Sequence, residues 1–264
     1  MVSAEQIQFG DKVDFVVPTG NFGDILAGWY AKKMGLPVGK LVCASNRNKV
    51  LADFFKTGVY DVKRNFHRTM SPSMDILVSS NLERLLFEIS GRNAELTAQR
   101  MKDLAEKKEY SITEKEKEIL DAQFYAGFAG EDETVEAMYD IFEEYGYAMD
   151  THTGVALYVY MEYKKELKKT DKKDKTPIVV LSTANPYKFP QDVLYALSGN
   201  DVKDCFKGVK RLNLLTAMKP PKNLIAIRYA PLRFKTRVKN NLDAMADVIL
   251  RFAGGEVVPV PEKK

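Results

Sequence analysis

Short β-branched and aromatic runs alternate with helix-type segments over the first 58 residues, and this alternation constrains the fold more than any other feature of the sequence. The apolar runs are residues 13–17 (VDFVV) and 40–44 (KLVCA). Apolar side chains recur at helical spacing in residues 24–34 and 50–55. Gly35, Pro37 and Gly58 end the two helical segments. Strands joined by single helices run parallel. We therefore predict an α/β fold with a parallel sheet.

Helical patterning dominates the middle of the chain, where we expect no strand between successive helices. The segments concerned are residues 81–89, 95–108, 113–124 and 133–145. A run of helices of this kind predicts a helical insertion lying beside the sheet. We assign residues 91–149 to this insertion, and residues 1–90 and 150–264 to the α/β domain.

After the predicted insertion, residues 153–168 are predicted to form a further helix. Residues 177–181 (PIVVL) follow and are predicted to form the most buried strand, because the run is continuously apolar. After about residue 200 the pattern weakens, and residues 241–252 make a final predicted helix.

Composition excludes several classes of protein. The net charge is only +4 and lysines are interleaved with acidic residues, so we expect no nucleic-acid surface. No apolar stretch approaches the roughly 20 residues that span a bilayer, and no signal peptide is expected. Cys43 and Cys205 lack the spacing of metal ligands, so no metal site is expected, and two unpaired cysteines favour a cytoplasmic location.

A glycine turn at residues 18–24 (PTGNFGD) lies where a strand ends and a helix begins. Gly20 and Gly23 allow a tight turn and a close approach of a ligand to the backbone. The free N–H groups at the start of the following helix favour an anion such as phosphate. The spacing matches neither GxGxxG nor a P-loop. An anion site and a simple strand-to-helix connection are both compatible with these residues.

A polar turn at residues 182–189 (STANPYKF) follows the predicted strand at 177–181. Its hydroxyls could contact a ligand, but Ser182 or Thr183 could equally cap a helix and Asn185 could form a turn. The same two alternatives hold for His152 and for Ser80, Asn81 and Arg84, all near predicted helix starts. The sequence has only two histidines and no nucleophile motif such as GxSxG, so a hydrolase triad has no support.

Six segments in this order resemble threonine synthase over roughly residues 13–200. They are residues 18–24 (PTGNFGD), 46–51 (NRNKVL), 69–75 (TMSPSMD), 79–84 (SSNLER), 150–156 (DTHTGVA) and 182–189 (STANPYKF). The resemblance implies the parallel-sheet, three-layer large domain of the tryptophan-synthase β-like fold with a helical insertion. It also implies pyridoxal 5′-phosphate as the cofactor.

The resemblance implies conversion of O-phospho-L-homoserine and water to L-threonine and phosphate, a lyase reaction of threonine biosynthesis. Carried over by position, Gly20, Asn21, Phe22, Gly23 and Asp24 would hold the cofactor phosphate, and Thr183 would bond the pyridine nitrogen. Ser80, Asn81, Arg84 and His152 are the candidates for the substrate side. Many relatives have asparagine at the position of Asp24 and histidine at that of Asn185.

The family's Schiff-base lysine lies in a Ser-Phe-Lys-Asp-like segment upstream of the glycine turn, and no lysine of this chain has that context. The resemblance therefore covers a carboxyl-terminal fragment, with no catalytic residue of its own and no activity expected of the polypeptide alone. Self-association through surface exposed by the missing half is also expected. Two alternatives remain: a non-catalytic module of the same fold that binds phosphate, pyridoxal phosphate or another protein, and another pyridoxal-phosphate enzyme of this fold such as a threonine deaminase.

Overall fold

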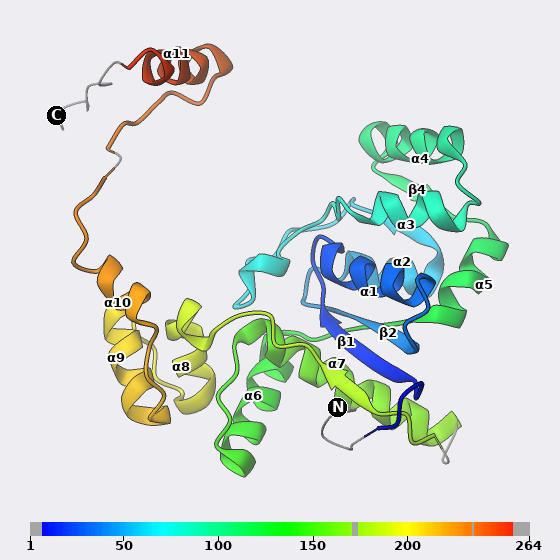
Figure 1. The fold of residues 1–264 in the computed structure, drawn as a ribbon, viewed down its shortest axis with the longest axis horizontal. Helices are drawn as coiled ribbons and strands as arrows, with labels where there is room; N and C mark the ends of the chain where they lie inside the picture. Colours follow the sequence, from blue (N-terminus) through cyan, green and yellow to red (C-terminus); the bar gives the residue numbers. More distant parts are fainter. Residues whose placement is uncertain (1–6, 171–173, 234, 256–264) are drawn as a thin grey trace. The chain divides into compact units, whose positions relative to one another are not determined.

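The computed structural model describes residues 7–170, 174–233 and 235–255, and its main feature is a four-stranded parallel sheet (Figure 1). The strands are β1 (Val13–Pro18), β2 (Val38–Ser45), β5 (Phe124–Phe128) and β6 (Ile178–Val180), in the order β5-β2-β1-β6. β1 pairs in parallel with β2 and with β6, and β2 pairs in parallel with β5. The predicted α/β fold with a parallel sheet is confirmed.

Helices cover both faces of the sheet, because alternate strand residues point to opposite sides. On one face, α1 (Gly23–Lys33) and α2 (Val50–Thr57) pack on Val17, Leu41 and Cys43. On the other face, α7 (Thr151–Thr170) packs on Val16, Val42 and Ala44. Figure 1 shows α7 on the opposite side of the strands from α1 and α2. Because the four strands are parallel, their carboxyl ends lie at one edge of the sheet.

The expectation of a helical run without strands is wrong at two places. β5 follows α5 (Glu114–Gln123) directly and joins the main sheet, with α6 (Glu131–Tyr145) after it. Five residues appended to a helix without a glycine or proline between them leave no periodic signal of their own. β4 (Glu109–Ser111) is only three residues long. The division at residues 91 and 149 stays a prediction.

β4 belongs to a small two-stranded antiparallel sheet with β3 (Val59–Asp61). Tyr60 and Tyr110 lie opposite each other across this sheet, with ring centroids 5.2 Å apart and ring planes within 3°. α3 (Leu82–Ile89) and α4 (Ala94–Lys107) lie in sequence between the two strands. Both tyrosines and the buried face of α3 belong to the same hydrophobic cluster as α1 and α2, which holds the start of α3 near the main sheet.

An ion pair is buried where α4 meets α5. The guanidinium of Arg100 donates to both carboxylate oxygens of Glu116, at 2.8 and 2.6 Å, and both side chains are 5% exposed. Glu116 also accepts the N–H and the hydroxyl of Thr113, which completes a capping box at the start of α5. A buried ion pair with these additional hydrogen bonds holds the two helices in one arrangement.

The strand predicted as the most buried is instead an edge strand. Within the described residues β6 pairs only with β1, and Ile178, Val179 and Val180 are each half-buried. A continuous apolar run is typical of a strand covered on both faces, but it does not report how many neighbours the strand has. The strand itself is present where the sequence predicts it.

Two 3₁₀ turns and two helices are the remaining described elements of the first unit. They are the 3₁₀ turns η2 (Pro72–Met74) and η3 (Pro186–Lys188) and the helices α8 (Pro190–Ser198) and α9 (Cys205–Thr216). The described residues from Pro220 onward form a second unit, which contains α10 (Lys222–Ile227) and α11 (Leu242–Ala253). None of the helices in the described part of the chain has the length and apolarity required to cross a bilayer.

Candidate functional site

The glycine turn after β1 is fixed by the core beneath it. Thr19 donates its N–H to the carbonyl of Ala44 at 2.8 Å, which ties the end of β1 to β2. Phe22 has a left-handed backbone with φ of 65°, a conformation that costs a non-glycine residue about 1 kcal/mol. Its ring is 1% exposed and lies 6.0 Å from that of Phe55. Burial of the ring offsets the backbone strain and holds the turn in one shape.

The turn presents backbone donors. Within the described residues, the N–H groups of Gly20, Asn21 and Phe22 have no hydrogen-bond partner. Gly23 donates its N–H to the side-chain oxygen of Asn21 at 3.0 Å and begins α1. Successive free N–H groups at the positive end of a helix dipole suit a phosphate. Asp24 is exposed to solvent at the first turn of α1.

The segment at residues 71–76 lies directly against Gly20. A Cβ atom at Gly20 would lie 3.0 Å from both the Cα atom of Met74 and the carbonyl oxygen of Ser73. It would also lie 3.1 Å from the side chain of Ile76. These contacts explain why the position needs glycine, and they were not predicted from the sequence, since the two segments are more than 50 residues apart.

The start of α3 also contacts the glycine turn. Asn81 donates to the carbonyl of Asn21 twice, from its backbone N–H at 3.1 Å and from its side-chain amide at 3.0 Å. Ser79 donates its hydroxyl to the carbonyl of Gly20 at 2.8 Å. Ser80 and Arg84 are exposed, and no ion pair of Arg84 occurs among the described residues. The sequence pointed to this segment but did not single out Ser79.

A buried tyrosine supports this contact. Tyr60 accepts the N–H of Ser79 at 2.8 Å and donates its hydroxyl to the carbonyl of Leu77 at 2.9 Å. Burial raises the pKa of Tyr60 to about 12, so the hydroxyl keeps its proton at neutral pH. The β3–β4 sheet thus fixes the segment that reaches Gly20.

The polar turn after β6 lies at the same edge of the sheet as the glycine turn. Val16 of β1 pairs with Val180 of β6, and Gly20 and Thr183 follow within four and three residues. Thr183 is exposed, and no hydrogen bond of its hydroxyl occurs within the described residues. Asn185 accepts the N–H of Tyr187 at 2.9 Å and caps η3, a local structural role.

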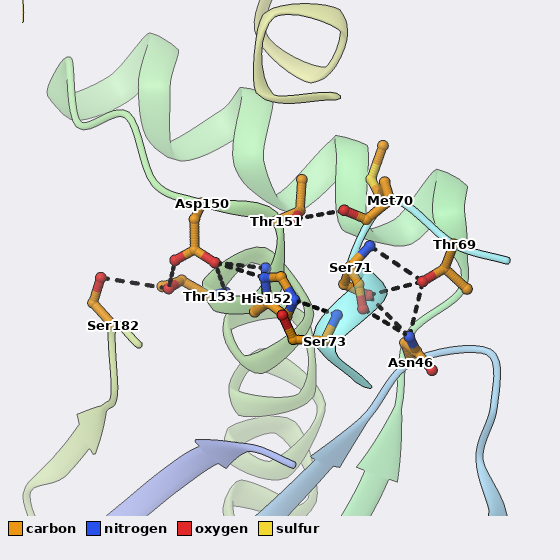
Figure 2. A network of polar contacts seen from close by, with 10 residues as sticks. All are labelled: Asn46, Thr69, Met70, Ser71, Ser73, Asp150, Thr151, His152, Thr153 and Ser182. Atoms are coloured by element: carbon orange, nitrogen blue, oxygen red, sulfur yellow. Dashed lines mark hydrogen bonds and ion pairs between the residues drawn. The ribbon is translucent and has the colours of Figure 1, made fainter. Parts of the chain in front are cut away.

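His152 lies in a buried polar network at the start of α7 (Figure 2). Its Nδ1 lies 3.0 Å from a carboxylate oxygen of Asp150, and its Nε2 accepts the N–H of Ser73 at 3.1 Å. The imidazole is nearly fully buried and packs against the ring of Phe189, 4.8 Å away. Both ring nitrogens therefore have partners inside the protein.

Asp150 is ionised in this network. Burial alone would raise its pKa, but hydrogen bonds from His152 and Thr153 outweigh burial and lower it. Its carboxylate accepts the backbone N–H of His152 at 2.9 Å, the hydroxyl of Thr153 and the ring of His152. Figure 2 shows the continuation of this network from Thr153 to Ser182.

A second set of hydrogen bonds holds the other side of the 69–75 segment. Asn46, which follows β2, donates to Thr69, Ser71 and Asp75. Asn48 donates to Asp75 at 3.0 Å. The sequence motifs 46–51 and 69–75 contain these residues, but their mutual contacts depend on packing and carry no sequence signal. Among the described residues, no cluster of three or more His, Cys, Asp or Glu side chains could hold a metal ion.

Comparison with known proteins finds similarity to threonine synthases and a threonine synthase-like protein. The family model for the carboxyl-terminal region of threonine synthase matches residues 153–249. A human protein, threonine synthase-like 1, is 40% identical over 206 residues, covering 77% of this chain and 26% of that protein. Threonine synthase from Pseudomonas aeruginosa is 38% identical over 181 residues, covering 69% of this chain and 37% of that protein. The chain thus spans well under half the length of these relatives.

A solved structure supports the same fold. The structure of pyridoxal-phosphate-bound threonine synthase from Brucella melitensis aligns with a TM-score of 0.67 and 34% sequence identity. The alignment covers 86% of this chain and 47% of that one.

Proposed function

This chain has a threonine synthase-type fold and corresponds to its carboxyl-terminal portion; on that premise we propose that it forms one wall of a pyridoxal 5′-phosphate site. The observation that carries the proposal is the position of two turns. The glycine turn after β1 and the polar turn after β6 follow paired parallel strands and therefore lie at one edge of the sheet. Open α/β sheets bind ligands at this edge.

The residues present fit the cofactor. Three backbone N–H groups that have no partner among the described residues provide donors for a phosphate. Thr183 provides an exposed hydroxyl for the pyridine nitrogen. Asp24 lies in solvent beside this turn, where its charge is screened.

Residues of this chain would bind the cofactor and orient it, and the cofactor would supply an electron sink when bound. The N–H groups of Gly20, Asn21 and Phe22 hold the cofactor phosphate, with Gly23 and Asp24 at the start of the following helix. The hydroxyl of Thr183 bonds the ring nitrogen without transferring a proton, since a neutral hydroxyl is a weak acid. The amide of Asn81 fixes the turn through the carbonyl of Asn21.

For the complete enzyme to which this chain would belong, the proposed reaction is the conversion of O-phospho-L-homoserine and water to L-threonine and phosphate. The guanidinium of Arg84, exposed at the start of α3, suits the phosphate of that substrate. Ser80 precedes it in the same turn and is exposed as well. The inactivity of the polypeptide alone, its self-association and its cytoplasmic location stay predictions.

We expect Thr183→Val to weaken binding of pyridoxine 5′-phosphate by about threefold to tenfold, the effect of losing one hydrogen bond. Pyridoxine 5′-phosphate has no aldehyde and cannot react with surface lysines, so calorimetry reports the site alone. Thr183→Ser keeps the hydroxyl and is expected to bind like the native protein. Equal affinities of the valine and serine variants would show that the hydroxyl of Thr183 does not contact the ligand. Absence of binding by the native protein would refute the proposed function.

We expect Arg84→Gln to weaken binding of O-phospho-L-homoserine, measured by calorimetry with pyridoxine 5′-phosphate already bound, by about tenfold. A charged hydrogen bond to the substrate phosphate is lost, while the cofactor turn is unchanged. Arg92→Gln is the matched control, because Arg92 follows α3 at its other end and pairs with Glu88 on the surface. An equal loss in both variants would show a general charge effect and exclude a specific role for Arg84.

A further inference from the structure

The backbone at Ser73 is held by the first turn of α7. Thr151 donates its hydroxyl to the carbonyl of Met70 at 2.7 Å, and His152 accepts the N–H of Ser73 at 3.1 Å (Figure 2). The Ser73 N–H has no other partner within the described residues. His152 is thus the contact that fixes this peptide unit from the α7 side.

The partners of His152 determine its tautomer. A backbone N–H can only donate, so the Nε2 atom that receives it from Ser73 carries no proton. The ionised carboxylate of Asp150 can only accept, so the Nδ1 atom 3.0 Å away carries the proton. Asp150 is itself fixed by the N–H of His152 and the hydroxyl of Thr153. The imidazole is therefore neutral and held in one orientation.

The peptide unit that His152 holds is the one that lies against Gly20. A Cβ atom at Gly20 would lie 3.0 Å from the carbonyl oxygen of Ser73 and from the Cα atom of Met74. A displacement of the Ser73–Met74 backbone would therefore change the space around the glycine turn directly. Two of the three nearest atoms to that Cβ position are backbone atoms, which cannot rotate away as the end of a flexible side chain can.

We propose that Asp150 and His152 are positioning residues: the fixed tautomer of His152 holds the Ser73–Met74 backbone against Gly20 and so sets the shape of the phosphate-binding turn. This inference rests on the proposed function for its ligand. It gives His152 a role different from the substrate contact expected from the sequence, because both ring nitrogens are already engaged and the ring is 3% exposed.

The tautomer is tested in the protein without ligand. The chain has only two histidines, so His67→Gln leaves His152 as the single imidazole. Two-bond ¹H–¹⁵N correlation spectra at neutral pH are expected to show a protonated Nδ1 and an unprotonated Nε2. A protonated Nε2, or a doubly protonated ring, would overturn the proposal without any variant at His152 itself.

A matched pair of substitutions separates the two contacts of the ring. His152→Gln can place an amide oxygen near the Nε2 position and keep the bond from Ser73. His152→Asn can place an amide nitrogen near the Nδ1 position, which keeps the contact with Asp150 and loses the one with Ser73. Both variants introduce the same functional group, so they differ mainly in which contact survives.

Calorimetry with pyridoxine 5′-phosphate and with pyridoxine gives the decisive comparison. We expect His152→Asn to weaken binding of the phosphate ester by about tenfold and His152→Gln by less than about threefold. Binding of pyridoxine, which has no phosphate, is expected to be equal in the two variants. Equal loss of phosphate-ester affinity in both, or an equal loss for pyridoxine, would overturn the proposal.

Hydrogen exchange distinguishes failure of this inference from failure of the proposed function. The Ser73 amide is expected to exchange slowly in the native protein and in His152→Gln, and rapidly in His152→Asn. If the native protein binds no pyridoxine 5′-phosphate, the proposed function fails, and the Ser73 exchange rates still decide whether His152 positions this backbone. Fast exchange of Ser73 in the native protein would refute the positioning role.

Discussion

Gly20→Ala is expected to destabilise the protein by about 1–3 kcal/mol and to weaken binding of pyridoxine 5′-phosphate by more than about tenfold. The added methyl group would lie 3.0 Å from backbone atoms of Ser73 and Met74. Backbone atoms held by hydrogen bonds from two sides cannot move as a flexible side chain can. The glycine turn must therefore shift, and its N–H groups move with it. Chemical denaturation and calorimetry measure the two effects.

Gly208→Ala is the matched control for this substitution. Gly208 lies in α9, and a Cβ atom there would have only ordinary contacts of 3.4 to 3.5 Å. Alanine in a helix interior is favoured over glycine by roughly 0.5–1 kcal/mol, so this variant is expected to be as stable as the native protein or more so. If Gly20→Ala behaved like Gly208→Ala in both measurements, the close approach of the two backbones would be wrong.

Glu116→Gln is expected to cost about 3–5 kcal/mol at neutral pH, a large part of the stability of a typical domain. Removing the carboxylate leaves the buried guanidinium of Arg100 without its counter-charge. It also weakens the capping box with Thr113. Asp103→Asn, at the surface pair with Lys107 in which Asp103 is only half-buried, is the control and is expected to change stability much less than Glu116→Gln does.

The effect of Glu116→Gln should depend on pH with a defined sign. Burial would raise the pKa of Glu116, but hydrogen bonds from Arg100 and Thr113 outweigh it and lower the pKa. A lowered folded-state pKa gives stability that is complete above the unfolded-state value of about 4.3 and is lost as pH falls through the folded-state value. The difference between native and variant should therefore shrink below about pH 4. A difference independent of pH would contradict this assignment.

The first half of the sheet could be predicted because each element there has its own boundary signal. The run at residues 13–17 ends at Pro18, and the helix after Val50 ends at Gly58, whose φ is 73°. β5 could not be predicted, since Phe124 continues from α5 with no turn residue between them. The edge position of β6 was missed for a different reason: sheet order is a property of packing.

The candidate site also has one part that the sequence predicts and another that it does not. Residues 18–24 could be predicted as a turn with free donors, because glycine spacing and a helix start are local properties. The contact of Ser79 with the carbonyl of Gly20 spans 59 positions and leaves no local pattern. The same holds for the bond between His152 and Ser73, which spans 79 positions. Hydrogen bonds between residues so far apart in the sequence could be identified only from the structure.

The left-handed backbone at Phe22 has a consequence for the thermodynamics of binding. Because the ring lies 6.0 Å from that of Phe55 and 6.1 Å from that of Phe124, the hydrophobic core maintains the turn before any ligand arrives. A ligand that binds there has little conformational entropy of the loop to remove, so more of its contact energy is available as affinity. The same arrangement couples the packing of the hydrophobic core to ligand affinity. A mutation that loosens the aromatic cluster would lower the affinity although the mutated residue does not contact the ligand.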